Sequence, residues 1–487
     1  MNTFSTRTIV SLAVTLALAA GTASATNGYF TTGVGTKGKA QAGAGSANPE
    51  ELLSVATNPA GLAFLPETID AGLGFFSPMR DYSTSPSQLN GTCFVPPGAT
   101  RPVCPFTIGP NNLSSKNEFF PIPFVGMNWK LDEQSALALA FYARGGMNTQ
   151  WERGTATFDP QVLITGRPLV PAPTFPGTFG GGFDGGNGDA GVDLMQGFLN
   201  FSYGWKSSDD KFGLGASAIF AMQRFQARGV GAFAPYTETF VRSYCTSSGC
   251  GPSPSLQMPT NLSGNGHDMS YGYGASIGAI WNPAKVFSVA VAYTTKMSMG
   301  SFSNYKDLFA QSGGFDIPST GTIGLTVRPT DAWTLSFDVQ EIWYTDVDSV
   351  SNPIQNVQGC PILGGSNFEN CFGGNKGAGF GWDDMTVYKF GGSWKYSDDW
   401  TLRAGYSFAD QPIPNDQMPF NILAPGVMEQ HWTVGFTNML SSGNEWSLSF
   451  TYAPENTIRG PNYFDPTQSV ELNMKQFELE VSYSWGR

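Results

Sequence analysis

Alternation of apolar and polar residues at a period of two restricts the fold of this chain more than any other feature. From Trp333 to Gln340 every odd position is apolar and every even position is polar, and the pattern returns at 446–452 and 476–485. Successive side chains of a β-strand point to opposite faces. Each of these segments therefore has one apolar and one polar face, as in a soluble β-sandwich or a barrel in lipid.

The alternation and the turn residues around it predict fourteen strands. They lie near 67–82, 117–131, 134–145, 191–206, 211–227, 267–281, 285–300, 318–329, 332–346, 384–396, 399–410, 429–440, 444–455 and 472–485. Short polar turns are expected at 131–134, 207–210, 282–285, 329–331, 397–399 and 441–444. Between them lie long segments near 83–116, 146–190, 228–266, 301–317, 347–383, 411–428 and 456–471.

The alternation of short turns with long segments distinguishes a barrel in lipid from a soluble β-sandwich. Outer-membrane barrels have short turns at one end and long loops at the other, whereas a soluble array of sandwiches has no reason to alternate them. The chain is also rich in Gly and aromatic residues, and only 13% of its residues are charged, where about 25% is usual. We predict an all-β fold, a transmembrane antiparallel barrel of about fourteen strands with both termini in the periplasm.

The first 25 residues resemble a secretory signal peptide. Arg7 precedes an apolar run from Ile9 to Ala20, and the small residues of 23–25 suit signal peptidase. The run is too short for a membrane-spanning helix, which needs about 18 apolar residues, although a membrane anchor is the alternative. We expect cleavage after Ala25 and export to the outer membrane of a Gram-negative bacterium.

Six cysteines form three sequence-local pairs within the long segments. Because an exported chain meets an oxidising compartment, we expect three loop disulfides. Metal binding is the alternative, but neither histidine lies within a pair. All three pairs fall in segments of one parity, which would face outside the cell. The pairs are Cys93 with Cys104, Cys245 with Cys250, and Cys360 with Cys371.

Residues 26–66 differ from the rest of the chain because they are rich in Gly and Ala and do not alternate. Asn48-Pro49 is expected to open a short helix with Glu51 at the capping-box position, and Asn58-Pro59 to end it. Such a segment either hangs in the periplasm or folds back into the lumen as a plug. The remaining residues, 67–487, are assigned to the barrel.

This N-terminal segment resembles the start of the FadL family of outer-membrane transporters. The similarity lies in Thr26-Asn27-Gly28-Tyr29-Phe30, in 33–37 and 43–45, and in 56–61, where Asn58-Pro59-Ala60 looks like the family's hatch motif. The resemblance implies a monomeric barrel plugged by a hatch, through which long-chain fatty acids or aromatic and aliphatic hydrocarbons diffuse. Ligand would be captured between extracellular loops and leave sideways at a kinked third strand, with the hatch acting as gate.

The resemblance also suggests ligand-binding residues. In the family the loop at 146–190 helps to form the capture groove; here it carries Leu163, Ile164, Phe175, Phe179 and Phe183. These side chains either bind ligand or only pack the loop against itself.

Four further residues are candidates for the lumenal route. Tyr29 and Phe30 either touch ligand or anchor the plug to the barrel wall. Gly145 and Gly146 mark either the kink, since Gly weakens strand pairing, or an ordinary strand end. Arg144 either meets a carboxylate head group, lines a wet lumen or binds lipopolysaccharide phosphates.

Other functions find less support in the sequence. No HExxH or Ser signature accompanies His267 and His431, which we expect at solvated strand ends, so we expect no enzyme, metal or cofactor. A net charge of −12 without basic clusters disfavours nucleic acid. A general porin, or an adhesin or structural barrel acting through its loops, remains an alternative. Expected partners are a hydrophobic small molecule, outer-membrane lipid and lipopolysaccharide, and the barrel assembly machinery.

Overall fold

The computed structural model describes residues 26–88, 108, 112–152, 189–246, 249–251 and 255–486. The predicted signal peptide, the Cys93 and Cys104 pair, and all five candidate residues of the loop at 146–190 lie outside the described residues. None of the helices in the described part of the chain has the length and apolarity needed to cross a membrane.

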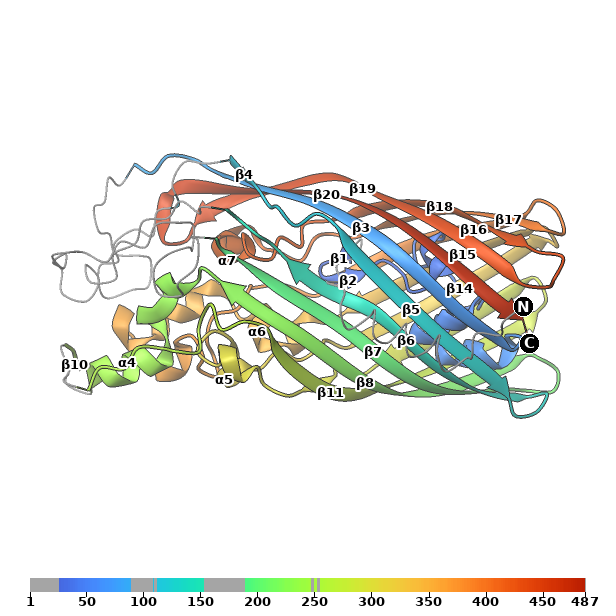
Figure 1. The fold of residues 1–487 in the computed structure, drawn as a ribbon, viewed down its shortest axis with the longest axis horizontal. Helices are drawn as coiled ribbons and strands as arrows, with labels where there is room; N and C mark the ends of the chain where they lie inside the picture. Colours follow the sequence, from blue (N-terminus) through green and yellow to red (C-terminus); the bar gives the residue numbers. More distant parts are fainter. Residues whose placement is uncertain are drawn as a thin grey trace, which may run out of the picture.

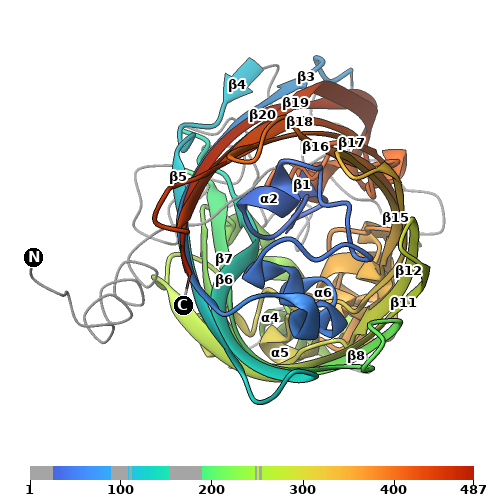
Figure 2. The same cartoon turned by 90° about the vertical axis from the view of Figure 1, so that its right-hand side faces the viewer.

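Fourteen long strands form one closed antiparallel barrel (Figures 1 and 2). Each pairs with its neighbours along the chain, and the first pairs with the last, from Thr68 opposite Gly486 to Thr84 opposite Val470. The fourteen strands are β3 (Thr68–Thr84), β5 (Phe120–Lys130), β6 (Ser135–Asn148), β7 (Gly191–Lys206), β8 (Phe212–Arg228), β11 (Asp268–Ala284), β12 (Phe287–Thr294), β14 (Thr320–Thr330), β15 (Trp333–Ile342), β16 (Met385–Lys395), β17 (Trp400–Phe408), β18 (Gln430–Met439), β19 (Glu445–Asn462) and β20 (Asp465–Gly486).

The alternation has the predicted structural meaning. In β15, Trp333 and Leu335 are 45% and 47% exposed on the outer surface, whereas Ser336 and Asp338 are buried inside the barrel. The outer surface is therefore apolar, as contact with lipid requires, and the inner wall carries polar side chains. The predicted barrel class and strand number are confirmed.

The predicted long loop at 456–471 is wrong, because β19 and β20 continue through it and meet at Tyr463-Phe464. A register shift between Ala453 and Asn456 moves the strand by one residue. Such a shift exchanges the inward and outward positions beyond it. The alternation therefore changes phase, and the polar residues after Pro454 imitate a loop.

The strand predicted at 285–300 is interrupted. It divides into β12 and a short strand, β13 (Ser298–Met299), each of which pairs with β11 at a different place. Two further short strands, β9 (Cys245–Thr246) and β10 (Gly249–Cys250), form a separate hairpin, and β4 (Asn112–Ser114) pairs with β3.

The described parts of the long connections after β8 fold into compact structure over one end of the barrel (Figure 1). Cys245–Cys250 and Cys360–Cys371 are disulfides, so two of the three predicted pairs are confirmed. The helices at this end are α4 (Glu238–Tyr244), α5 (Ala310–Gly313), α6 (Asp348–Ser351) and α7 (Met418–Asn421), with 3₁₀ helices η3 (Gly231–Tyr236), η4 (Ser303–Tyr305), η5 (Tyr344–Asp346), η6 (Ile354–Gly359), η7 (Pro361–Leu363), η8 (Phe368–Asn370) and η9 (Asn415–Gln417).

Residues 26–66, here called the lumenal segment, lie inside the barrel (Figure 2). The segment contains β1 (Thr26–Asn27), β2 (Phe30–Thr31), α2 (Thr36–Lys39), and the 3₁₀ helices η1 (Leu52–Ala56) and η2 (Pro59–Phe64). The predicted capping box is wrong, because η1 begins at Leu52 without a side-chain cap and Glu51 accepts from Gly38 N instead. The helix η1 ends at Ala56, just before Asn58-Pro59 as predicted, and Asn58-Pro59 also begins η2.

Candidate functional site

The Asn58-Pro59-Ala60 sequence fastens the lumenal segment to the barrel wall. The Asn58 side chain accepts a hydrogen bond from Ala60 N at 3.0 Å, and Pro59 fits the first helical position, where no N–H is needed. The Asn58 amide also donates to Ser46 O at 3.0 Å and to Ala279 O on β11 at 3.5 Å. One side chain thus caps η2, closes a turn of the segment and binds the wall.

Glycines of three adjacent strands allow η2 to lie directly on the wall. A Cβ atom added at Gly215 would overlap the backbone of Pro59 and Ala60, and one added at Gly278 would overlap Asn58. Gly204 on β7 approaches η2 in the same way. We call these the glycine cradle; a side chain at any of them would push η2 away.

Buried charges hold the opposite side of the lumenal segment. Lys39 forms ion pairs with Glu478 and, at 2.6 Å, with Glu480 of β20, and all three side chains are almost fully buried. Lys37 pairs with Glu445 of β19. Because a buried charge without a partner is very costly, these pairs tie α2 to the wall.

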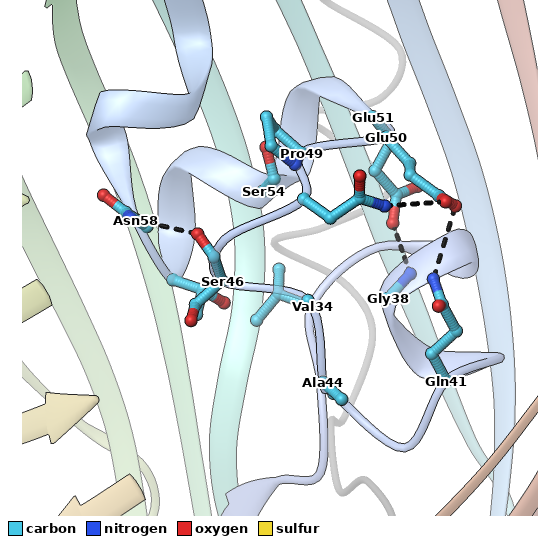
Figure 3. Close-up of a pocket in the computed structure, with 14 residues that line it drawn as sticks. Val34, Gly38, Gln41, Ala44, Ser46, Pro49, Glu50, Glu51, Ser54 and Asn58 are labelled. Carbon is cyan, nitrogen blue, oxygen red and sulfur yellow. Dashed lines mark hydrogen bonds between the residues drawn. The ribbon is translucent and has the colours of Figure 1, made fainter. Parts of the chain in front are cut away.

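A small polar pocket of about 30 Å³ lies within the lumenal segment itself (Figure 3). Glu50 accepts hydrogen bonds from Asn48, Gln41 and, at 2.7 Å, from Arg403 Nε of β17. Enclosure in this pocket raises the pKa of the Glu51 carboxyl to about 7. The pocket offers polar atoms and charge, which suit water and not an apolar molecule.

Aromatic rings gather where the lumenal segment begins. The ring of Tyr29 lies 5.0 Å from Phe30, 5.2 Å from Tyr344 and 5.8 Å from Trp382, measured between centroids. The four residues are almost fully buried. The structure therefore brings the two predicted residues Tyr29 and Phe30 together with two aromatic residues that we did not predict.

Arg144 lies beside this cluster. Its guanidinium carbon is 4.7 Å from the centroid of the Phe30 ring, and it donates a hydrogen bond to Thr320 Oγ1 at 3.3 Å. Within the described residues no carboxylate comes within ion-pairing distance of Arg144. A guanidinium in this position is free to receive an anionic group or to lie against a π-system.

The wall next to Arg144 contains an unpaired stretch. The β5–β6 ladder ends at the pair Val125–Phe141, and the pairing of β6 with β7 shifts register between Ala143 and Gly145. Beyond this point Gly145 pairs with Phe30 of the lumenal strand β2 and not with β5. We call the unpaired edges, 120–124 of β5 and 142–148 of β6, the seam.

A small pocket of about 30 Å³ lies behind the seam. It is lined by Phe76 of β3, by Gly146 and Met147 of β6, and by Trp382. On the β5 side, Phe76, Phe120 and Ile122 form a small buried cluster against which Ala143 packs. The wall at this height is therefore closed by side chains and not by a backbone ladder: by this apolar cluster and by the buried Arg80 of β3, which donates to the carbonyl of Asn148 on β6.

A second, more apolar pocket, of about 40 Å³, lies under the long loops. Its walls come from β7, β8 and four separate loops, and they include Phe225, Phe233, Phe309, Phe372, Phe380 and Phe420. Phe380 lies 6.3 Å from Trp382, which lines the seam pocket. Adjacent rings thus join the outer pocket to the seam.

The structure corrects one expectation and shows what sequence reasoning missed. His431 is fully buried, with Nδ1 3.3 Å from Ser407 Oγ, and not solvated as expected. One phenylalanine of the outer pocket, Phe225, lies on β8, and the others come from four loops that are separated in the sequence. The high density of Phe in 301–317 was the one sequence signal for this pocket, but no local sequence pattern indicates which rings come together.

Comparison with known proteins gives a consistent result. A family model described as outer membrane protein transport protein (OMPP1/FadL/TodX) matches residues 174–458. A long-chain fatty acid transport protein of Shigella flexneri is 26% identical over 275 residues, which cover 52% of this chain and 58% of that protein. The corresponding protein of Escherichia coli O157:H7 is 25% identical over the same coverage. The chain thus matches a little over half the length of these relatives.

Solved structures show the same fold. The toluene transporter TodX of Pseudomonas putida has a TM-score of 0.58 at 16% identity, covering 94% of this chain and 99% of the other. A FadL homologue of Pseudomonas aeruginosa has a TM-score of 0.59 with the same identity and coverage. At this level of identity the likeness concerns the barrel architecture.

Proposed function

Since the chain belongs to the outer membrane protein transport protein family (OMPP1/FadL/TodX), we propose that it is a channel for the diffusive uptake of hydrophobic small molecules. The observation that carries the proposal is the continuous set of aromatic contacts from the outer pocket to the seam. The channel would take up long-chain fatty acids or aromatic and aliphatic hydrocarbons, bind them without catalysis, and release them into the membrane.

Capture would take place in the apolar pocket under the long loops. Removal of apolar groups from water contributes about 0.8 kcal/mol per CH₂, so a pocket lined by six Phe side chains retains such molecules. From this pocket the ligand would follow two ring contacts inward: Phe309 to Phe315, at 4.9 Å, and Phe315 to Tyr29, at 6.4 Å.

Lateral release is favoured over passage along the barrel axis. Below Tyr29 the axis is filled by the lumenal segment, with buried charges such as Lys39 and the polar pocket at Glu50. Burial of an apolar molecule among these groups would strip them of their partners at high cost. The seam instead offers apolar side chains and direct access to lipid, so we propose it as the exit, with Gly145 at the kink.

The lumenal segment is proposed to act as the hatch. Phe30 occupies the β6 edge at the seam, and Asn58 holds the segment in the glycine cradle. Movement of the segment's first residues would uncover the seam while η2 stays fixed. A filled lumen also speaks against the general porin, which needs an open aqueous path.

A binding measurement tests the proposal. Detergent-purified protein is titrated with oleate and with toluene, and Phe309→Asp is compared with Leu256→Asp. Phe309 is buried in the outer pocket, whereas Leu256 is exposed on a loop. We expect wild type and Leu256→Asp to bind and Phe309→Asp to lose binding. Absence of binding by wild type, together with steady ion conductance in planar bilayers, would contradict the proposal.

The remaining expectations stay predictions. These are a monomeric state, contact with lipopolysaccharide, and recognition by the barrel assembly machinery, for which the alternating residues from Phe477 to Trp485 are the expected signal. The short turns and the carboxyl end of β20 lie at the same end of the barrel (Figure 1). We propose that this end faces the periplasm.

A further inference from the structure

We infer that Pro121 and Pro123 keep the seam unpaired, because they remove the two N–H groups with which β5 would otherwise bind β6. The inference rests on the proposed function insofar as it makes these prolines positioning residues of the exit. Pro121 and Pro123 stand in β5 as Phe120-Pro121-Ile122-Pro123-Phe124.

The direction of the missing donors follows from the register. In an antiparallel strand, the N–H and C=O groups of successive residues point to opposite neighbours. The pairing of β5 with β3 runs without interruption from Phe120 to Met127, across both prolines. Proline has no backbone N–H, so this ladder cannot depend on donors at Pro121 and Pro123. The even residues of β5 therefore point their N–H and C=O groups toward β3.

A side-chain hydrogen bond of the same strand supports this parity. The backbone N–H of Lys130, an even residue, donates at 2.7 Å to the Glu67 side chain, just before β3 begins. The odd residues of β5 therefore face β6. Val125, an odd residue, forms the last pair with Phe141, and the next two odd residues towards the start of β5 are the prolines.

The register also identifies the residues that lose a partner. Continued pairing beyond Val125–Phe141 would place Pro123 opposite Ala143, and the ladder stops one step before this pair. Beyond Ala143 the bulge of β6 reverses which residues face β5, so that Gly146 N–H and not Gly145 N–H points to the seam. There β2 takes the place of β5: Phe30 pairs with Gly145, and Gly146 N donates to Tyr29 O at 3.1 Å.

A third proline lies at the same place. The β3–β5 ladder ends at Phe76 opposite Phe120, and Pro78 is the next residue of β3 whose N–H would point toward β5. Proline within sheets is confined to edges and bulges because it cannot donate to a ladder. Three prolines at one interruption of an otherwise closed barrel indicate that the sequence itself encodes an unpaired strand edge. The lumenal strand β2 is then a detachable cover for that edge.

The test is the double variant Pro121→Val/Pro123→Val, which restores both donors in residues that favour strands. Amide hydrogen exchange is measured in lipid nanodiscs over 141–147, together with uptake of radiolabelled oleate by cells. We expect exchange at Ala143, the next residue of β6 whose N–H faces β5, to slow by ~10-fold, as one added hydrogen bond predicts, and uptake to fall. Pro454→Val, in the bulge of β19, is the matched control and should change neither.

The exchange and uptake measurements can each contradict the inference. Unchanged exchange in the double variant overturns the inference, and so does slower exchange with unchanged oleate uptake. Failure of the proposed function would appear separately, as wild-type protein that takes up neither oleate nor toluene. Heat-modifiable migration in gels verifies folding, and the single variant Pro123→Val, next to the existing ladder, should slow exchange at Ala143 alone.

Discussion

Single residues of the lumen combine apolar surroundings with isolated polar groups. Arg144 lies against the Phe30 ring and has only Thr320 as a side-chain hydrogen-bond partner in the described part of the chain. In such a pocket a few polar groups decide the orientation of a ligand, whereas apolar walls supply most of the affinity. Arg144 is therefore the residue at which fatty acids and hydrocarbons should be distinguished.

Arg144→Gln should weaken oleate binding by ~10-fold, because a charge-assisted hydrogen bond contributes about 1.5–3 kcal/mol. Toluene binding should not change, since toluene has no anionic group. Isothermal titration of the purified protein measures both affinities. Arg242→Gln, on the exposed face of α4, is the control. Equal losses for oleate and toluene would show that Arg144 only supports the packing of Phe30.

Glu51 predicts a pH dependence of the lumenal segment. The pKa of its carboxyl is raised from 4.5 to about 7 by burial, so the docked segment favours the neutral acid. Docking is therefore strongest below about pH 4.5 and weakens as the pH rises to about 7. Hydrogen exchange over 48–57, corrected for its intrinsic pH dependence, should quicken across this window. Glu51→Gln should show no such change; a change of equal size would exclude Glu51 as the cause.

At the scale of elements, two kinds of contact hold the lumenal segment. The helix η2 docks on the glycine cradle through close backbone packing, and α2 is held by the ion pairs of Lys39. The packing of η2 depends on the absence of side chains at the cradle glycines, whereas the ion pairs of α2 depend on the charges of Lys39 and its two glutamates. The two contacts should therefore fail independently.

Lys39→Met should release α2, because it leaves Glu478 and Glu480 buried without a cation, at a cost of about 3–5 kcal/mol. We expect faster hydrogen exchange over 36–45 and new conductance in planar bilayers. Lys306→Met, on an exposed loop, should change neither. The triple variant Lys39→Met/Glu478→Gln/Glu480→Gln should recover much of the wild-type behaviour; if it behaves like the single variant, the lysine acts through packing alone.

At the scale of the whole molecule, the barrel separates two environments along its length. The long loops and their two disulfides build the apolar pocket at one end, and the short turns and the polar lumenal segment lie at the other. The proposed route uses only the first half of this length before it turns sideways into lipid.

The proposed orientation predicts which end reacts from outside the cell. In separate variants, Lys306→Cys on a long loop and Asp331→Cys in the β14–β15 turn place one thiol at each end. A membrane-impermeant maleimide should label the first in intact cells and the second only after lysis. Labelling of Asp331→Cys in intact cells would reverse the orientation.

Strand number, the end that carries the loops and the nearest cysteine pairs could be predicted from the sequence because each depends on local patterns. Period two, turn residues and short spacing are visible within a dozen residues. After Ala453 a bulge changes the phase of the apolar–polar alternation, and there the same reasoning predicted a loop where the structure has strands. The prolines at 121 and 123 were equally visible, but their effect depends on which neighbour their missing donors face.

The tertiary structure alone decided the site. Tyr29, Arg144 and Trp382 are far apart in sequence, and barrel closure brings them to one height of the lumen. No local pattern encodes such a meeting, because it depends on the register of every strand between them. The alternation thus determined that this chain encloses a lumen, and the folded barrel determined that the lumen is filled and that the backbone pairing of its wall is interrupted at one seam.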